Sequence, residues 1–261
     1  MQEFLAKNKP RSVTLDDERV VPGHSDLATY SAHLARYEFL LPQIRSEEVV
    51  LETACGSGYG TALLAQRARR VVGVDYAQAA LEFAAAHHAR PNLQYLRMDV
   101  HRLAFPDASF DRVVSFEVFE HLEEPDCYLA ECARVLRAGG TLALSTPNAA
   151  AWNVHMQSIG QEYEFHINIV DLDALRGFLS KHFAVCEIYG QRRRGSVIYA
   201  VLRGLDVFNL RLRFVRPQQR EKMQAAMGVD TGGQVNAASW VFTRSQLRQC
   251  NTFLAVCTKA R

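Results

Sequence analysis

The sequence lacks several features that would define other classes of protein. No apolar run approaches the roughly eighteen residues that cross a bilayer, so we expect no transmembrane segment. The six cysteines contain no C-x-x-C pair, and we therefore expect reduced thiols, no metal site and no redox centre. The first stretch, MQEFLAKNKPR, has no apolar core of a secretion signal, which indicates a cytoplasmic protein. We find no internal repeat, no low-complexity segment and no recognisable RNA-binding module.

Charge is unevenly distributed along the 261 residues, although the net charge is only +2. The segment from Gln191 to Arg261 has thirteen lysines and arginines and three aspartates and glutamates, a net charge of +10. The rest of the chain therefore has a net charge of −8. Such a run is often only a solvated surface. The alternative is an anionic partner, namely a phosphorylated or nucleotide-linked substrate, a nucleic acid or an anionic membrane surface.

The most informative segment is Leu51–Gly60, which reads LETACGSGYG. An apolar run predicts a buried strand that ends at Glu52, and three glycines then predict a turn before the helix-forming stretch Thr61–Ala68. A strand, a glycine turn and a helix together allow a nucleotide-like ligand to approach bare backbone.

Two kinds of ligand compete for this turn. The dinucleotide pattern G-x-G-x-x-G fits Gly56 and Gly58, but its third glycine position is occupied by Thr61. Glu52 would repel a pyrophosphate, whereas it would attract an ammonium and a sulfonium group. The turn therefore favours S-adenosylmethionine.

A second acid follows the next predicted strand, RVVGV, at Asp75. A carboxylate in this place can accept hydrogen bonds from both ribose hydroxyls, although it could instead cap the helix that starts near Ala77. A third strand, Leu93–Met98, is followed by Asp99 and Val100. The blocks FPDASFDRVVSFEVFEHL and RVLRAGGTLALSTPN then predict a fourth and a fifth strand with the turns that follow them.

Taken together, these blocks resemble class I S-adenosylmethionine-dependent methyltransferases over Val49–Gln191, in order and in spacing. The resemblance is nearest to bacterial enzymes of sugar, polysaccharide and natural-product pathways. It implies S-adenosyl-L-methionine as cofactor and S-adenosyl-L-homocysteine as product. Asp99 would accept from the adenine amino group, Phe116 would contact the methionine part, and Arg36 would pair with its carboxylate. The expected cofactor-binding residues are Arg36, Tyr37, Glu52, Ala54, Gly56, Gly58, Asp75, Tyr76, Asp99, Val100 and Phe116.

The residues expected to serve the acceptor follow the fourth and fifth strands. His166, in EYEFHINIVD, is our first candidate for a base, because related chains carry a histidine in a phrase close to N-P-F-H. This sequence departs from that phrase, and His166 could instead pack against a helix end. Glu117 and His121 are further candidates, with His121 as an alternative brace of its turn. No metal ligand is assigned.

These patterns predict an α/β, Rossmann-like class I methyltransferase fold with a seven-stranded, mostly parallel sheet and helices on both faces. We expect an N-terminal loop and cofactor-covering helix (1–46), a cofactor-binding core (47–191), a basic helical cap or lid (192–251) and a last strand (252–261). Thr252–Thr258 is expected to be the last strand, and the resemblance implies that it inserts antiparallel beside a sixth strand near Phe183–Tyr189. Within the cap, Val197–Phe214 and Gln218–Met227 are expected to be helical.

The expected function is transfer of a methyl group to a hydroxyl, or to an amine, of a small-molecule acceptor. The basic cap favours an acceptor that bears phosphate, such as a nucleotide-linked sugar. Nucleic acid is not the expected partner, weak contact with a membrane surface stays open, and so does the oligomeric state. Two alternatives remain: an RNA methyltransferase whose basic cap follows phosphates, and a non-catalytic protein that only binds S-adenosylmethionine.

Overall fold

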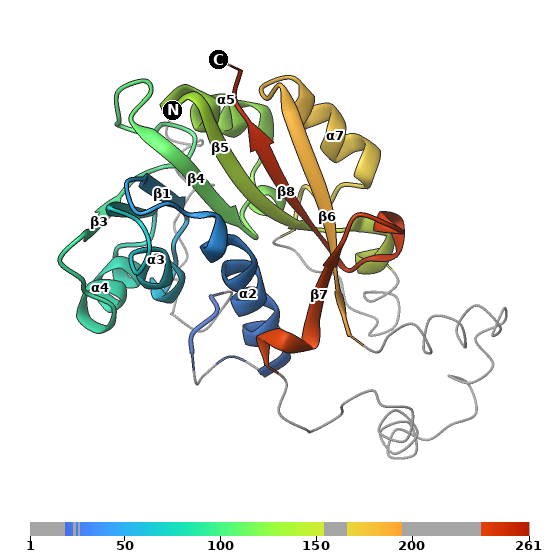
Figure 1. The fold of residues 1–261 in the computed structure, drawn as a ribbon, viewed down its shortest axis with the longest axis horizontal. Coiled ribbons are helices and arrows are strands. Elements are labelled where there is room, and N and C mark those ends of the chain that lie inside the picture. Colours follow the sequence, from blue (N-terminus) through green and yellow to red (C-terminus); the bar gives the residue numbers. More distant parts are fainter. Residues whose placement is uncertain (1–18, 23–24, 26, 154–165, 195–235, 261) are drawn as a thin grey trace, which may run out of the picture.

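The computed structural model describes residues 19–22, 25, 27–153, 166–194 and 236–260 (Figure 1). Both helices that we expect in the cap, Val197–Phe214 and Gln218–Met227, lie outside the described residues. The described chain forms one eight-stranded sheet with helices on its two faces. Among the described residues, no helix has the length and apolar character needed to span a bilayer.

The sheet has the strand order β3-β2-β1-β4-β5-β8-β6-β7. The first five strands in sequence run parallel to one another, and β8 lies antiparallel between β5 and β6, as the sequence predicts. The strands are β1 (Val49–Thr53), β2 (Arg70–Asp75), β3 (Leu93–Arg97), β4 (Phe110–Phe116), β5 (Leu136–Pro147), β6 (Val185–Arg193), β7 (Trp240–Thr243) and β8 (Thr252–Thr258).

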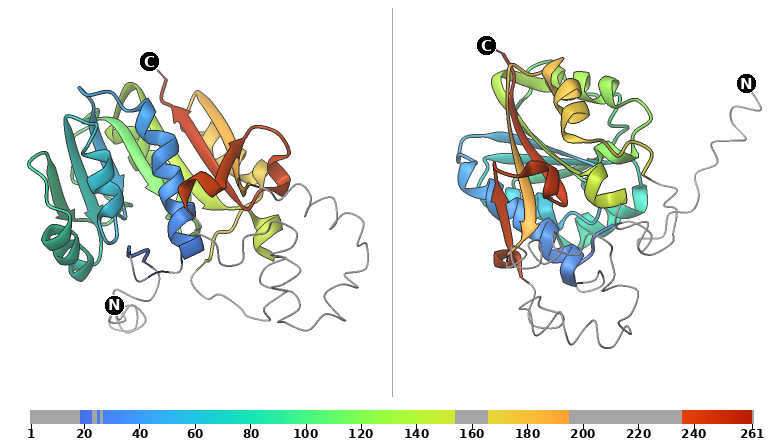
Figure 2. Two further views of the ribbon diagram at one scale, coloured as in Figure 1. Left: turned by 60° about the horizontal axis from the view of Figure 1, so that its bottom comes forward. Right: turned by 90° about the vertical axis from the view of Figure 1, so that its right-hand side faces the viewer.

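Helices cover both faces of the sheet (Figures 1 and 2). On one face, α2 and α3 pack over the central strands, while α5 and α7 cover the other face. Helix α4 lies beside the start of α3 at the β3 side. The helices are α2 (Leu27–Leu40), α3 (Tyr59–Leu64), α4 (Gln78–His87), α5 (Pro125–Val135) and α7 (Leu172–Ser180).

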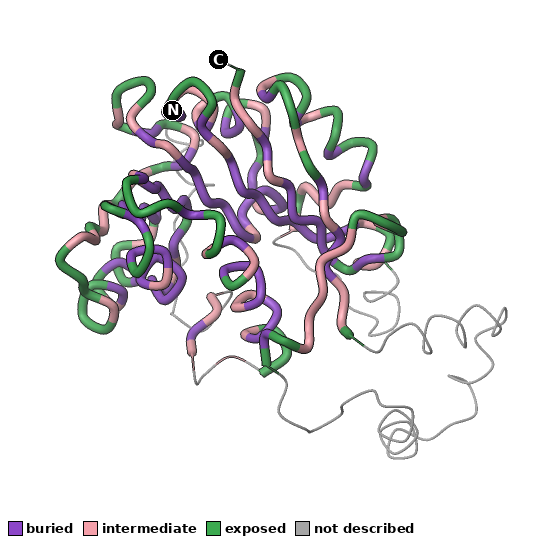
Figure 3. The backbone as a smooth tube through the Cα atoms, in the orientation of Figure 1, coloured by how far each residue is buried: buried purple, intermediate pink, exposed green. Residues whose placement is uncertain are grey.

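Central strands bury side chains on both faces, so that each strand contributes to two cores (Figure 3). Val50 packs with Leu40 and Leu64 on the face that α2 and α3 cover. The next residue, Leu51, belongs to the core of Tyr128 on the opposite face. Successive side chains of a strand point to opposite faces, which explains why these strands read as continuous apolar runs in the sequence.

Helix boundaries follow local signals that the sequence displays. Helix α2 gives way at Leu41 to a short 3-10 turn that contains Pro42, which cannot continue the hydrogen-bond pattern of an α-helix. Pro125 occupies the first turn of α5, where its missing N–H costs nothing. The side chain of Asp171 accepts hydrogen bonds from the amides of Asp173 and Ala174, which caps α7.

The sheet has eight strands rather than the seven that we predicted. The extra strand, β7, pairs antiparallel with β6, and β6 continues to Arg193. Both segments reach into the range 192–251 that we had assigned to a helical cap. The correction is that the described part of that range extends the sheet, with 3-10 turns at Ala237–Ser239 and Leu247–Gln249 on either side of β7.

Two of the cysteines form a disulfide, which corrects our expectation that all six are reduced. Cys186 in β6 and Cys257 in β8 are direct partners across the antiparallel pair, and their sulfur atoms are bonded. The other four, Cys55, Cys127, Cys132 and Cys250, are free. Sequence spacing could not reveal the pair, because the two residues are 71 positions apart and meet only through strand register.

The disulfide predicts a definite thiol count. Titration of the chain in denaturant without reductant should find four thiols, and six should appear after reduction. Denaturant is needed because three of the four free cysteines are buried. Six thiols before reduction would contradict the bond and restore the reduced state that the sequence suggested.

Candidate cofactor and acceptor site

A cavity of about 1040 Å³ opens at the carboxyl ends of the parallel strands. It brings together residues from α2, from the turns after β1, β2, β3 and β4, and from the segment near His166. Open α/β sheets bind their ligands at this edge. The sequence-predicted residues that line it are Arg36, Tyr37, Ala54, Gly56, Asp75, Tyr76, Asp99, Val100, Phe116, Glu117, His121 and His166.

The turn after β1 has the backbone that its glycines allow. Ala54, Gly56 and Gly58 have φ of 49°, 54° and 80°, in the left-handed region that glycine adopts most easily. A Cβ added at Gly56 would have the side chain of Arg19 as its nearest neighbour, at 3.7 Å, and Arg19 also lines the cavity. Bare backbone therefore faces this end of the cavity and leaves space for a ligand.

Asp75 holds this turn against the start of the next helix. Its Oδ2 accepts a hydrogen bond from the amide of Gly56 at 2.9 Å, and its Oδ1 accepts one from the amide of Ala77 at 2.9 Å. The guanidinium of Arg19, which sequence reasoning missed, lies 3.6 Å from Oδ1. Each carboxylate oxygen has a second lone pair, so Asp75 can bind ribose hydroxyls while it holds the amides of Gly56 and Ala77.

Glu52 does not line the cavity, although we expected it to face the cofactor's positive groups. It is almost fully buried beneath the turn, where Tyr37 Oη donates to Oε1 at 2.7 Å and Thr61 Oγ1 donates to Oε2. Burial raises the pKa of Glu52 to about 7, and the two hydrogen bonds only partly oppose that rise. Its contacts make Glu52 a support of the glycine turn.

This burial predicts a pH-dependent stability that Glu52→Gln should remove. A raised pKa means that the folded state holds the proton more tightly than the unfolded state. The contribution of Glu52 to the free energy of unfolding is then complete below about pH 4.5 and is lost as the pH rises through about 7. In urea unfolding over this range, wild type should lose up to about 3 kcal/mol relative to the variant. Parallel pH profiles of the two proteins would contradict the prediction.

Gly58 also lies outside the cavity lining, although we expected it to contact the cofactor. A Cβ at this position would come within 2.5 Å of the Ala84 Cβ and within 2.7 Å of the Tyr95 hydroxyl. The same hydroxyl donates to the Gly58 carbonyl at 3.1 Å. Gly58 is thus the point where the turn packs against α4 and β3.

A polar cluster joins α2 to the end of β4, and two of its members, Arg36 and Glu117, line the cavity. Arg36 donates from Nε to Gln191 Oε1 at 2.7 Å, and its Nη1 lies 3.3 Å from Glu117 Oε1. Nη1 is within ion-pair distance of Glu117 but forms no hydrogen bond to any described residue. It can therefore donate a hydrogen bond to a carboxylate in the cavity. Ser145 Oγ donates to Glu117 Oε1 at 2.7 Å. Sequence reasoning missed Gln191 and Ser145, which only the fold brings to this place.

The opposite end of the cavity carries the residues expected to contact adenine. Tyr76 is 62% exposed, and the Arg97 guanidinium lies 5.3 Å from its ring centre. Asp99 Oδ1 accepts from the amide of His101 at 2.9 Å and lies 3.0 Å from its Nδ1. Val100 is buried beside them. A flat apolar base can rest here while Asp99 keeps acceptor capacity for an amino group.

The acceptor-side histidines lie close together. The rings of His121 and His166 are 4.7 Å apart between centroids, and the ring of Trp152 lies 4.4 Å from that of His166. Burial, with the neighbouring His121 as a smaller cause, lowers the pKa of His166 to about 4. The imidazole is therefore neutral at physiological pH. No pattern in the sequence indicated Trp152, or Trp240 on the same cavity.

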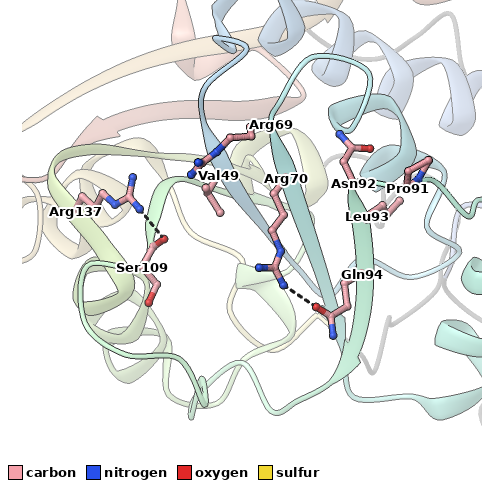
Figure 4. A pocket seen from close by; sticks show the side chains of 9 residues that line it. All are labelled: Val49, Arg69, Arg70, Pro91, Asn92, Leu93, Gln94, Ser109 and Arg137. Atoms are coloured by element: carbon pink, nitrogen blue, oxygen red, sulfur yellow. Dashed lines mark hydrogen bonds between the residues drawn. The ribbon is translucent and has the colours of Figure 1, made fainter.

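A second cavity, of about 730 Å³, opens at the other edge of the sheet, where the strands begin (Figure 4). Three arginines line it, of which Arg70 donates to Gln94 at 2.9 Å and Arg137 pairs with Asp111 at 2.7 Å. Figure 4 shows their side chains spread around the opening. None of the sequence-predicted site residues lines this cavity.

The strand order, the glycine turn after β1 and the acid after β2 match the Rossmann-like class I methyltransferase fold. The family model described as "Methyltransferase domain" matches residues 51–144. A Mycobacterium tuberculosis protein named "Probable S-adenosylmethionine-dependent methyltransferase" is 40% identical over 53% of this chain and 50% of its own length. A ubiquinone biosynthesis O-methyltransferase of Albidiferax ferrireducens is 29% identical over 64% of this chain and 73% of its own.

Solved structures share the fold at low sequence identity. The YcgJ protein of Bacillus subtilis superimposes with a TM-score of 0.58 at 17% identity, over 88% of this chain and 100% of its own. The [4+2]-cyclase SpnF superimposes with a TM-score of 0.54 at 15% identity, over 92% of this chain and 85% of its own. Because SpnF is a cyclase by name, the shared fold alone does not determine the reaction.

The chain is thus similar to proteins named as S-adenosylmethionine-dependent methyltransferases, and its residues 51–144 match the methyltransferase-domain family. It spans about half the length of the first curated relatives that it matches.

Proposed function

We propose that this protein transfers the methyl group of S-adenosylmethionine to an oxygen, or to a nitrogen, of a small molecule. One observation carries the proposal. Twelve residues selected from the sequence, on segments far apart in the chain, line a single cavity of about 1040 Å³. Residues assigned to the cofactor and to the acceptor share that cavity, as a transfer between two bound molecules requires.

The described residues fit the cofactor group by group. The bare backbone at Gly56 and the carboxylate of Asp75 suit an adenosyl ribose. Arg36 Nη1, which has no hydrogen bond within the described ranges, suits the methionine carboxylate, and Glu117 beside it suits the amino group. Asp99 suits the adenine amino group. This order of contacts supports a sulfonium near Phe116, between the ribose and the acceptor side.

The chemistry asks little of the protein beyond orientation. The acceptor forms a bond to the methyl carbon while the sulfur–carbon bond breaks, and the leaving thioether is neutral. Most of the rate enhancement then comes from holding the two reactants close and aligned. Trp152 and His166 line the cavity with their rings 4.4 Å apart, and we assign them to the acceptor side. A hydroxyl acceptor must also lose its proton, and His166 stays our first candidate for that step.

The relatives outline the nature of the acceptor without identifying it. The ubiquinone biosynthesis relatives carry O-methyltransferase in their names, which supports oxygen as the acceptor atom. A phosphate-bearing acceptor stays an expectation that rests on the basic range after Gln191.

The test is a transfer assay with methyl-labelled S-adenosylmethionine. The chain is incubated with a small-molecule cell extract and, separately, with total RNA from the same cells. We expect label in the small-molecule fraction and formation of S-adenosylhomocysteine. Label in RNA would instead support the alternative that the protein is an RNA methyltransferase. Cofactor binding without label in either fraction would overturn the enzymatic proposal in favour of a non-catalytic binding protein.

A further inference from the structure

We propose that Glu120, His121 and His166 form a binding site for a divalent transition-metal ion at the acceptor end of the cavity. Each of the three offers one ligand atom, and these atoms all lie within 4.8 Å of one another. All three residues line the cavity. Metal binding can be tested by itself, whereas a role of the ion in catalysis rests on the proposed function.

The fold positions these ligands from two directions. Glu120 and His121 end the 3-10 turn Phe119–His121 that follows β4, and His166 comes from the segment before α7. Two hydrogen bonds of Asn168 tie these segments together: its amide donates to the Glu120 carbonyl at 3.0 Å, and its side chain donates to the Leu122 carbonyl. The approach of His166 to the turn is therefore built into the backbone.

The spacing is close to what one ion needs. Bonds of roughly 2.0–2.2 Å to nitrogen and oxygen place ligand atoms about 3–4.4 Å apart on a common metal. The observed separations, all within 4.8 Å, are close to this range. We expected no metal site because the cysteines contain no C-x-x-C pair, and that pattern does not report a site that joins Glu120 and His121 to the distant His166.

Charge and burial also favour a cation. Glu120 is fully buried; its Oε2 accepts from Thr146 Oγ1 at 3.1 Å, but its Oε1 has no hydrogen-bond partner within the described ranges. Glu117 follows the same strand, and Arg36 forms its ion pair with Glu117. A buried carboxylate oxygen that lacks a partner is costly, and coordination to a metal is a common way to satisfy it.

The donor set selects the kind of ion. Two imidazoles and one carboxylate suit Zn²⁺, Fe²⁺, Co²⁺ or Mn²⁺ better than Ca²⁺ or Mg²⁺, which prefer oxygen ligands. Three protein ligands also leave coordination positions open for an acceptor hydroxyl. An ion held by these residues would polarise such a hydroxyl and ease the loss of its proton to water; the oxygen would then form the bond to the methyl carbon while the sulfur leaves as a neutral thioether. His166 then acts as a ligand rather than as the free base.

The experiment uses the full chain, stripped with chelator and titrated with Co²⁺. We expect one Co²⁺ per chain, visible as d–d absorption and displaced by Zn²⁺. Glu120→Gln and His166→Asn should each weaken binding at least about tenfold, because loss of an outer partner alone costs that much. The matched control is His182→Asn, which changes a histidine that lies 3.6 Å from Asp126 outside the cavity. It should bind Co²⁺ like wild type.

The outcomes separate this inference from the proposed function. Titration of S-adenosylmethionine into the same samples reports the fold and the cofactor site. If wild type binds the cofactor but no Co²⁺, or if His166→Asn binds Co²⁺ as tightly as wild type, the metal site is wrong and methyl transfer stands. If Glu120→Gln fails to fold, His166→Asn alone decides. If wild type binds Co²⁺ but no cofactor, the metal site stands and the proposed function falls.

Discussion

Asp75→Ala is expected to weaken S-adenosylmethionine binding more than tenfold, measured by isothermal titration calorimetry. The variant removes the carboxylate that faces the cavity after β2 and that we assign to the ribose hydroxyls. It also frees the amides of Gly56 and Ala77, which that carboxylate now holds at 2.9 Å. Hydrogen bonds to a charged acceptor are each worth roughly 1.5–3 kcal/mol, and loss of one such bond suffices for a tenfold change.

Asp75→Asn separates the two roles of this residue. The amide oxygen can still accept from one of the two backbone amides, whereas the charge that attracts both ribose hydroxyls is lost. We expect affinity between that of wild type and that of the alanine variant, with a smaller loss of thermal stability. An exposed acid outside the cavity, Asp173, supplies the control as Asp173→Ala. Unchanged affinity of Asp75→Ala would refute the ribose role.

Gly58→Ala is expected to lower the free energy of unfolding by about 2–4 kcal/mol. The position has φ of 80°, which costs a non-glycine residue about 1 kcal/mol. The added Cβ also meets the Ala84 Cβ at 2.5 Å and the Tyr95 hydroxyl at 2.7 Å, and overpacking of this kind adds about 1–3 kcal/mol. Because Ala84 belongs to the neighbouring helix α4, relief of the clash requires that the two helices move apart.

Gly139→Ala is the matched control for the packing part of this effect. Gly139 has a similar φ of 74°, but a Cβ there would meet nothing within 4 Å. Urea unfolding of both variants should show the larger loss at Gly58. Equal losses would mean that only the backbone conformation matters and that the contact with α4 is unimportant.

The core of the fold could be predicted because its signals are local. Apolar runs that end in turn residues located the parallel strands, and Thr252–Thr258 is observed as β8 with the predicted bounds. The glycine turn was visible for the same reason, since its backbone needs residues that tolerate positive φ. These features depend on a few neighbouring residues and little on the rest of the chain.

The remaining features depend on contacts between distant segments. The four residues of β7 become a strand by pairing with β6, and the disulfide depends on the register of β6 against β8. Glu52 follows the apolar strand as predicted, but its partners Tyr37 and Thr61 turn it beneath the loop rather than into the cavity. The ion pair of Arg36 with Glu117 joins α2 to the end of β4, and no spacing in the sequence indicates it.

Equilibrium dialysis tests most directly the claim that one cavity at the carboxyl edge of the sheet holds S-adenosylmethionine. The chain is dialysed against labelled S-adenosylmethionine and, separately, against reduced pyridine nucleotide. We predict retention of one S-adenosylmethionine per chain, displaced by S-adenosylhomocysteine and weakened more than tenfold in Asp75→Ala. Firm retention of the pyridine nucleotide together with no retention of S-adenosylmethionine would contradict the account.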